Sequence, residues 1–254
     1  MTRREIIKHI DNGANFYISL FGRAEHMAMT DNGLFATVQP KAGEQGISFV
    51  YNIRIEHLDT SRQIEVVNQI HLLRRPIWLN LLASDQVTRL IFGKPRVHGQ
   101  TEFGEEDEIY EAMLPEDAPS PADCNAQVMQ VTTPESFALW TQIVNGLLSE
   151  GRQDIHPRGH YSLCREGLLR CYLLYQDGEI TAAAAVADNH GIDSLEFVCV
   201  QPDFRRQGFG AAICRYAAAE AFANGAKILT VRANSLAAAK LYQSVGFQIY
   251  NDAI

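Results

Sequence analysis

The run "RRQGFG" at positions 205–210 has the residue types and spacing that suit an anion-binding turn. Gly208 and Gly210 let the backbone approach a ligand closely, and the alanine-rich run after them predicts a helix. The first N–H groups of a helix have no partner within it and lie at the positive end of its dipole. The turn can therefore hold a pyrophosphate, although a plain strand-to-helix turn is also typical of such a run.

Of two other phosphate-binding loops, the Walker loop is excluded at this turn and the dinucleotide-binding fingerprint matches it only weakly. A Walker loop carries Lys and then Ser or Thr after its last glycine, whereas two alanines follow Gly210. A dinucleotide-binding fingerprint needs a glycine where this chain has Ile213. Such a fingerprint also lies in the first βαβ unit of its domain, whereas the turn in this chain follows three predicted antiparallel strands. The pattern that remains is [Q/R]-x-x-G-x-[G/A], which Arg205, Gly208 and Gly210 satisfy.

The elements that position this turn are clearest in the second half of the chain. Alternating hydrophobic residues, turn residues and helix caps predict each of them. The predicted order is a strand at 125–131, a helix at 132–150 capped by Thr132 or Thr133, a loop at 149–166 that contains a short helix, three antiparallel strands within 168–200, a helix at 208–225, a strand at 227–233, a helix at 235–246 and a strand at 247–254.

The first half of the chain has a similar order of elements. It predicts strands at 34–40 and 47–56, a helix at 60–75 with a Thr60/Gln63 capping box, a strand at 76–83, a helix at 84–93 and a strand at 107–114. The three prolines of 115–124 mark a linker. We therefore expect two lobes, residues 1–114 and 125–254, in an α/β protein with a mixed sheet.

Composition and charge narrow the classes of protein. The 254 residues are 46% hydrophobic and 20% charged, without an apolar run long enough to span a membrane and without an export signal. The net charge of −8 belongs to residues 102–123, which hold nine carboxylates and no Lys or Arg, as in a solvated acidic linker. A nucleic-acid partner is excluded because it requires a basic face.

Cysteine usage indicates the compartment. Five cysteines form no C-x-x-C pair, and their odd number argues against a disulfide framework or a zinc site. The chain is therefore expected to reside in a reducing cytoplasm, with no metal.

The surroundings of the glycine turn carry a resemblance to a known family. "VCVQPDF" precedes the turn, and "NSLAAAKLYQSVGF" follows it after a strand. Together these runs resemble the GNAT acetyltransferase superfamily, whose motif is V-x-P-x-x-[R/Q]-x-x-G-x-G followed by N-x-x-A-x-x-L-Y-x-x-x-G-F. The resemblance covers about residues 126–254. Residues 1–114 lack a glycine turn and resemble the degenerate first lobe of tandem GNAT-like proteins; an unrelated α+β domain is the alternative.

The resemblance implies acetyl-CoA as co-substrate. In the family the strand before the turn separates from its parallel neighbour, and the pantetheine arm pairs with the exposed edge. The residues that this places at acetyl-CoA are Val198, Cys199, Val200, Arg205, Arg206, Gln207, Gly208, Phe209, Gly210, Ala211, Asn234 and Ser235. The family's asparagine lies seven residues before the tyrosine, a position that Ser235 occupies, so either Ser235 or Asn234 makes this contact, or Ser235 is a plain N-cap. A buried structural strand is the alternative for 198–200.

The resemblance also implies an acid and leaves the base open. Tyr242 matches the tyrosine that protonates the departing CoA thiolate, and a tyrosine packed on the sheet is the alternative. Glu196 is a candidate base, because strand alternation predicts that it shares a face with Val198; a half-exposed strand residue is the alternative. His156, His160 and His190 lie in loops and are further candidates.

These observations predict a GNAT-type N-acetyltransferase. It would transfer the acetyl group of acetyl-CoA by direct attack to a primary amine of a small molecule or a protein. A lobe that binds acyl-CoA without turnover, as a sensor or an interaction module, is the alternative. The sequence identifies neither the acceptor substrate nor the oligomeric state.

Overall fold

The computed structural model describes residues 1–44, 46–80, 83–93, 109–120, 127–148 and 155–250. The predictions for the two ends of the acidic segment (102–108 and 121–123), the end of the linker with Cys124 (121–124), the start of the loop (149–154) and the last residues (251–254) lie outside the described residues.

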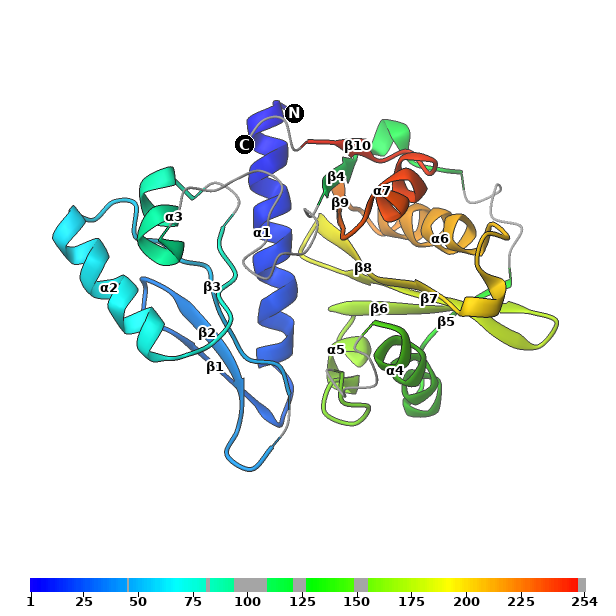
Figure 1. The fold of residues 1–254 in the computed structure, drawn as a ribbon. Helices are drawn as coiled ribbons and strands as arrows, with labels where there is room; N and C mark the ends of the chain where they lie inside the picture. Colours follow the sequence, from blue (N-terminus) through cyan, green and yellow to red (C-terminus); the bar gives the residue numbers. More distant parts are fainter. Residues whose placement is uncertain (45, 81–82, 94–108, 121–126, 149–154, 251–254) are drawn as a thin grey trace.

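A long helix, α1 (Arg3–Gly22), lies between the two lobes (Figure 1). It is not among the elements predicted above. Thr2 and Glu5 form a capping box at its N-terminus, and Ile6, Ile7 and Ile10 are buried. The helix packs against β1 and β2 of the first lobe and against three strands of the second lobe's sheet.

The first lobe is a small antiparallel sheet with two helices. Its elements are β1 (Met27–Asp31), β2 (Ala36–Pro40), β3 (Phe49–Tyr51), α2 (Thr60–Leu72) and α3 (Asp85–Phe92), and the sheet order is β1-β2-β3. The predicted strands at 34–40 and 47–56 are thus present but shorter. The predicted strand at 76–83 is wrong, because within its described residues only an isolated bridge joins Ile77 to Val50.

The predicted capping box of α2 is also wrong. Asp59, not Thr60, is the N-cap, and its side chain accepts from the backbone N–H of Arg62 at 3.0 Å. The amide of Gln63 instead donates to the carbonyl oxygens of Ile55 and Leu58, both at 3.1 Å. Gln63 therefore ties the preceding loop to the helix.

The second lobe is built on a seven-stranded mixed sheet of order β10-β4-β9-β8-β7-β6-β5. Its elements are β4 (Ile109–Met113), β5 (Gln127–Gln130), α4 (Pro134–Leu148), α5 (Tyr161–Arg165), β6 (Leu169–Gln176), β7 (Glu179–Ala187), β8 (Ile192–Val200), α6 (Phe209–Ala223), β9 (Ile228–Ala233), α7 (Leu236–Gln243) and β10 (Gln248–Ile249), with short 3-10 turns at η1 (Pro115–Asp117) and η3 (Pro202–Phe204). Among the described strands of this sheet, β8 and β9 pair in parallel and the other neighbours are antiparallel.

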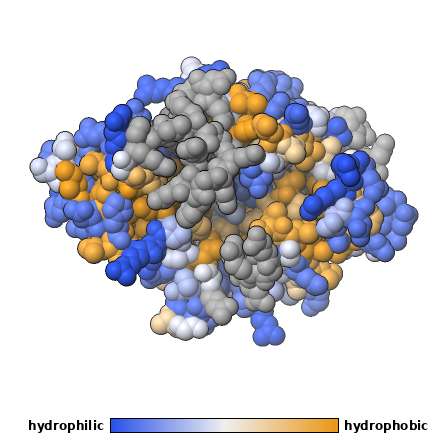
Figure 2. All heavy atoms as spheres, viewed as in Figure 1, coloured by the Kyte–Doolittle hydropathy of each residue, from blue (hydrophilic) through white to orange (hydrophobic). Residues whose placement is uncertain are grey.

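Helices cover both faces of this sheet. Figure 1 shows α6 and α7 on one side and α4 and α5 on the other. An apolar cluster joins the lobes, since Phe21 and Val38 of the first lobe belong to it together with Trp140, Leu173 and Cys199 of the second. Figure 2 shows hydrophobic residues at the surface over both lobes. A shared apolar core of this kind holds two lobes in a fixed relation.

Strand β4 connects the lobes through the sheet itself. It follows the first lobe in sequence, yet it pairs antiparallel with β9, from Ile109 opposite Ala233 to Met113 opposite Leu229. On its other side β4 pairs with β10, where Ala112 lies opposite Gln248. The first 114 residues thus supply one inner strand of the sheet on which the candidate site lies.

Candidate active site

The two parallel strands separate at the expected place. Pairing of β8 with β9 runs from Ile192 opposite Ile228 to Leu195 opposite Val231 and stops there. β8 continues to Val200, so the strand edge that contains residues 198–200 is no longer paired with β9. A free strand edge offers backbone groups to an extended ligand arm.

A β-bulge in β8 redirects the side chains at this point. Ala185 of β7 lies opposite Glu196, but Ala183 lies opposite Cys199, so β8 carries one extra residue here. Phe197 takes the strain, with φ of 55°. Val198 packs with the cluster under α6 and α7, whereas the Glu196 carboxylate contacts Arg232. The predicted common face of Glu196 and Val198 is therefore wrong.

The glycine turn leads from β8 into α6. Gly208 is the N-cap of α6, with φ of 89°, and a Cβ added there would meet no atom within 4 Å. A Cβ on Gly210 would lie 3.2 Å from Leu241 Cδ2, so this glycine serves close packing of α6 on α7. Arg205 Nε donates to the carbonyl oxygen of Val200 at 3.2 Å, which ties the turn to the end of β8.

The turn fits a pyrophosphate. Gly208 is exposed, and the N–H of Ala212 is bonded to the carbonyl oxygen of Gly208 at 3.0 Å. The N–H groups that precede Ala212 belong to the first turn of α6, where the helix supplies no acceptor. No carboxylate lies among residues 205–211, so the turn presents backbone donors and two arginines to an anion.

At the start of α7, Ser235 is the N-cap. Its hydroxyl accepts from the backbone N–H of Ala238 at 3.2 Å, and Asn234 lies exposed just before it. The capping interpretation of Ser235 is therefore confirmed. Of the two residues predicted to contact acetyl-CoA here, Asn234 is therefore the exposed one, immediately before the N-terminus of α7.

Tyr242 lies buried on α7, with 6% of its surface exposed. Its ring packs against Phe247 at a centroid distance of 5.8 Å. Burial is the main cause that raises the pKa of Tyr242 well above its ordinary value, and the nearby groups Cys214, Glu196 and Glu111 add to it, while Arg232 opposes. The hydroxyl therefore stays protonated at neutral pH, as a proton donor requires.

Glu196 is held by an arginine that the sequence did not single out. Arg232 Nη2 donates to Oε2 at 3.0 Å and to Oε1 at 3.2 Å, and both side chains are about nine-tenths buried. The Arg232 guanidinium lies 4.9 Å from the ring centroid of Tyr17 and 4.6 Å from that of Trp78. Both aromatic residues belong to the first lobe, so the two lobes meet at this ion pair.

Two of the candidate loop histidines lie against the first lobe. The backbone N–H of His156 donates to His160 Nδ1 at 2.9 Å, and the rings of His156 and His160 lie 5.1 and 4.9 Å from that of His26. Because Nδ1 of His160 is an acceptor, Nε2 carries the proton of the neutral ring and cannot accept another. His160 is therefore no base in this arrangement. His190 lies exposed in the turn before β8.

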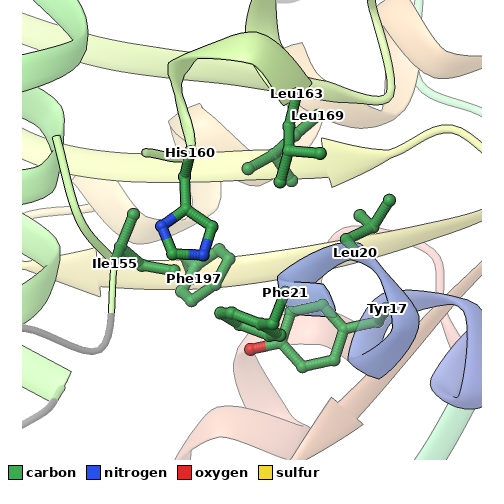
Figure 3. A pocket seen from close by; sticks show the side chains of 8 residues that line it. All are labelled: Tyr17, Leu20, Phe21, Ile155, His160, Leu163, Leu169 and Phe197. Atoms are coloured by element: carbon green, nitrogen blue, oxygen red, sulfur yellow. The ribbon is translucent and has the colours of Figure 1, made fainter. Parts of the chain in front are cut away.

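A small cavity of about 10 Å³ lies beside His160 (Figure 3). Its lining consists of Tyr17, Leu20, Phe21, Ile155, His160, Leu163, Leu169 and Phe197. Burial, and then the neighbouring His26, lower the pKa of His160 to about 4. The cavity has room for about one water molecule, so it is a packing gap between the lobes and not an acceptor pocket.

Within the described part of the chain, no group of three or more His, Cys, Asp or Glu side chains could hold a metal ion. None of the helices described is long and apolar enough to cross a membrane.

Comparisons with known proteins place the fold. A family model described as Acetyltransferase (GNAT) domain matches residues 168–249. A GCN5-related N-acetyltransferase from Kribbella flavida is similar with a TM-score of 0.65 and 19% identity, over 94% of this chain and 91% of that chain. A GCN5-related N-acetyltransferase from Sphaerobacter thermophilus is similar with a TM-score of 0.53 and 15% identity, over 87% of this chain and 79% of that chain. A search of curated proteins finds no match.

The mixed sheet, its separating parallel strands and the glycine turn give the second lobe the fold of these GCN5-related N-acetyltransferases. The GNAT acetyltransferase domain model matches 168–249, within the part of the chain where the motifs resemble that family, whose members transfer acyl groups from acetyl-CoA. The mixed-sheet α/β fold expected from the motifs is confirmed.

Proposed function

We propose that the protein is an N-acetyltransferase that transfers the acetyl group of acetyl-CoA to a primary amine by direct attack. The observation that carries this proposal is the combination of three features around the end of β8. The pairing of β8 with β9 stops after Leu195, the glycine turn follows β8, and Tyr242 of α7 belongs to the same apolar cluster as Val198 and Val200. Thioester, pyrophosphate and leaving group each have a group of matching chemistry among these features.

In this mechanism the edge at 198–200 pairs with the pantetheine arm, and the N–H groups from Arg206 to Ala211 hold the pyrophosphate. A backbone N–H near Val198 stabilises the negative charge that develops on the carbonyl oxygen. The amine nitrogen forms the new C–N bond as the C–S bond breaks, and Tyr242 gives its proton to the sulfur.

Glu196 is the proposed base, directly or through a water molecule. The bulge at Phe197 turns its carboxylate away from the α6 and α7 face, toward Arg232 and the first lobe. The acid and the base then lie on opposite faces of the sheet. Such a division suits direct attack, because the leaving sulfur and the incoming ammonium each have their own proton-transfer partner.

Residues 1–114 are proposed to be a non-catalytic, degenerate GNAT-like lobe that forms one wall of the acceptor site, with 115–124 as the linker and 125–254 as the catalytic lobe. Within these bounds β4 (Ile109–Met113) is the exception, because it is a strand of the catalytic lobe's sheet. A cytoplasmic location fits this assignment, since acetyl-CoA and free thiols occur there; the four described cysteines are all free.

One observation favours a second candidate function. Both Glu196 oxygens contact Arg232 Nη2, and a carboxylate held in this way is a hindered base. The lobe would then bind acyl-CoA without turnover, as a sensor or an interaction module. Thermal unfolding with acetyl-CoA, followed by thiol release over an amine panel, separates the two functions. Stabilisation without release for any amine supports the sensor, and no stabilisation refutes both.

The role of Tyr242 has a direct test. Tyr242→Phe removes the proton donor and keeps the packing on Phe247, so kcat should fall by about 100-fold while the Kd of acetyl-CoA stays the same. Tyr250→Phe is the matched control, because Tyr250 is also buried but follows β10 and lies beside Arg3. Unchanged turnover in Tyr242→Phe would remove this residue from the chemistry.

A further inference from the structure

Arg232 lies at the point where the two parallel strands separate. Val231 is the last residue of β9 that pairs with β8, and Leu195 is its partner. Arg232 and Glu196 are the next residues on the two strands, and their side chains join at 3.0 and 3.2 Å. The ion pair thus connects the strands across the first position at which backbone pairing has stopped.

The first lobe fixes this arginine from two sides. Tyr17 comes from α1, and its ring centroid lies 4.9 Å from the guanidinium carbon. Trp78 comes from the segment after α2, at 4.6 Å, and its backbone N–H donates to the carbonyl oxygen of Val50 at 2.7 Å. A desolvated cation–π contact contributes about 1–2 kcal/mol. The planar guanidinium suits both the two ring faces and the carboxylate, which a lysine would not.

The surroundings of the pair reach the proposed acid. Tyr17 also packs on Phe197, the bulged residue of β8, at a centroid distance of 5.5 Å. The charge of Glu196 raises the pKa of Tyr242, and the charge of Arg232 lowers it. Tyr17 and Trp78 of the first lobe therefore contact the arginine of the pair, and Tyr242 of α7 is affected by the charges of both its members. Loss of Arg232 would remove the cation that opposes the effect of Glu196 on Tyr242.

We propose that Arg232 is a positioning residue for acetyl transfer, and that the first lobe acts on the reaction by stacking Tyr17 and Trp78 on it. Arg232 holds Glu196 toward the acceptor, at the mouth of the gap between β8 and β9. This inference rests on the proposed function. It gives the first lobe, which has no glycine turn of its own, a defined part in the chemistry of the second.

The experiment compares four variants with the wild type. Trp78→Leu keeps an apolar side chain but removes one ring, Trp78→Phe keeps a ring face, and Arg232→Met removes the charge. Phe16→Leu is the matched control, since Phe16 of α1 makes a cation–π contact with a different arginine, Arg23, at 5.4 Å. The probes are acetyl-CoA with tyramine, spermidine and a lysine-containing peptide.

Trp78→Leu and Arg232→Met should lower kcat by about tenfold or more, because one to two kcal/mol of orientation is lost, with the Kd of acetyl-CoA unchanged. Trp78→Phe should recover most of kcat, and Phe16→Leu should leave it unchanged. A normal kcat in both Trp78→Leu and Arg232→Met would overturn the proposal. So would a loss that appears only in the Kd of acetyl-CoA, or an equal loss in Trp78→Phe and Trp78→Leu.

Failure of the proposed function gives a different result. In that case the wild type itself acetylates none of the three amines, and no variant can differ from it in turnover. The stack is then tested by thermal unfolding of Trp78→Leu, Arg232→Met and the double variant. Shifts in Tm that are less than additive support the stack, and fully additive shifts refute it.

Discussion

His160 makes the stability of this protein depend on pH in a way that can be measured. Only 1% of its surface is exposed, and its Nδ1 accepts from the backbone N–H of His156 at 2.9 Å. Burial, and then the neighbouring His26, lower the pKa of His160 to about 4. A proton on Nδ1 would break this hydrogen bond and place a charge against the apolar wall of the cavity in Figure 3.

The size of the effect follows from the difference between the folded and unfolded states. A histidine in the unfolded chain titrates near pH ~6.5, so below that pH the unfolded chain binds the proton and the folded protein does not. The free energy of unfolding is therefore unaffected well above this pH and falls as the pH drops. The loss is about 2 kcal/mol at pH ~5 and about 3 kcal/mol below pH ~4.

His26, which lies beside His160, adds to the pH dependence of stability. Burial, and then His156, lower the pKa of His26, so His26 destabilises the fold in acid in the same sense. Glu44 opposes this shift and Lys41 adds to it. Protonation of these imidazoles would place like charges across the contact between the lobes, since His26 belongs to the first lobe and His160 to the second.

The assay is unfolding in urea, followed by tryptophan fluorescence, at pH ~7, ~6 and ~5. His160→Asn keeps an acceptor for the N–H of His156 but cannot be charged. It should start less stable than the wild type at pH ~7 and then lose about 2 kcal/mol less by pH ~5. His190→Asn, at an exposed turn position, should follow the wild type. Equal losses in His160→Asn and the wild type would refute the reasoning.

Two further predictions concern packing and charge in the second lobe. Glu111 is fully buried, and this burial raises its pKa to about 7, although Gln243 Nε2 donates to Oε1 at 3.0 Å. Stability should thus fall as the pH rises from ~4.5, where the unfolded carboxyl ionises, to about 7, and should level off above that. Glu111→Gln should abolish about 2.5 kcal/mol of the loss between pH ~5 and pH ~9 in urea titrations; parallel losses in variant and wild type would disprove it. Gly210→Ala and Gly208→Ala should each cost about 1–2 kcal/mol in thermal unfolding, the first by contact with Leu241 and the second by strain at positive φ. Leu241→Ala should then rescue only Gly210→Ala, and rescue of both or of neither would contradict the packing argument.

The elements of the second lobe could be predicted because their signals are local. Thr133 accepts from the backbone N–H of Ser136 at 3.2 Å, Ser235 caps α7, and α6 ends at Asn224 before Gly225, as the residue types indicate. Helix α1 has a local signal of the same kind, because Thr2 and Glu5 have the residue types and spacing of a capping box. This signal could have predicted the start of the helix.

The sequence predicted the part of the site that lies on one continuous strand–turn–helix segment, from β8 to α6. Arg232, Tyr17 and Trp78 lie on three distant segments, and a single sequence does not show which side chains meet. The bulge at Phe197 has no local signal either, because a residue with a side chain adopts φ of 55° there and no glycine marks the position. One extra residue was enough to reverse the direction expected for Glu196.

Strand β4 leaves the ribosome roughly 120 residues before its partner β9, which at ordinary rates of synthesis is a wait of about 6–24 s. During that time neither neighbour of β4 in the finished sheet has been synthesised, since β9 and β10 both lie near the end of the chain. An unpaired apolar strand is prone to pair with other chains unless it carries a charge. The burial of Glu111 is costly in the finished sheet, but its carboxylate is charged while β4 is still unpaired. We expect this charge to oppose pairing of β4 with other chains. Glu111→Gln is therefore expected to scatter more light during refolding, even though it is more stable at high pH once folded.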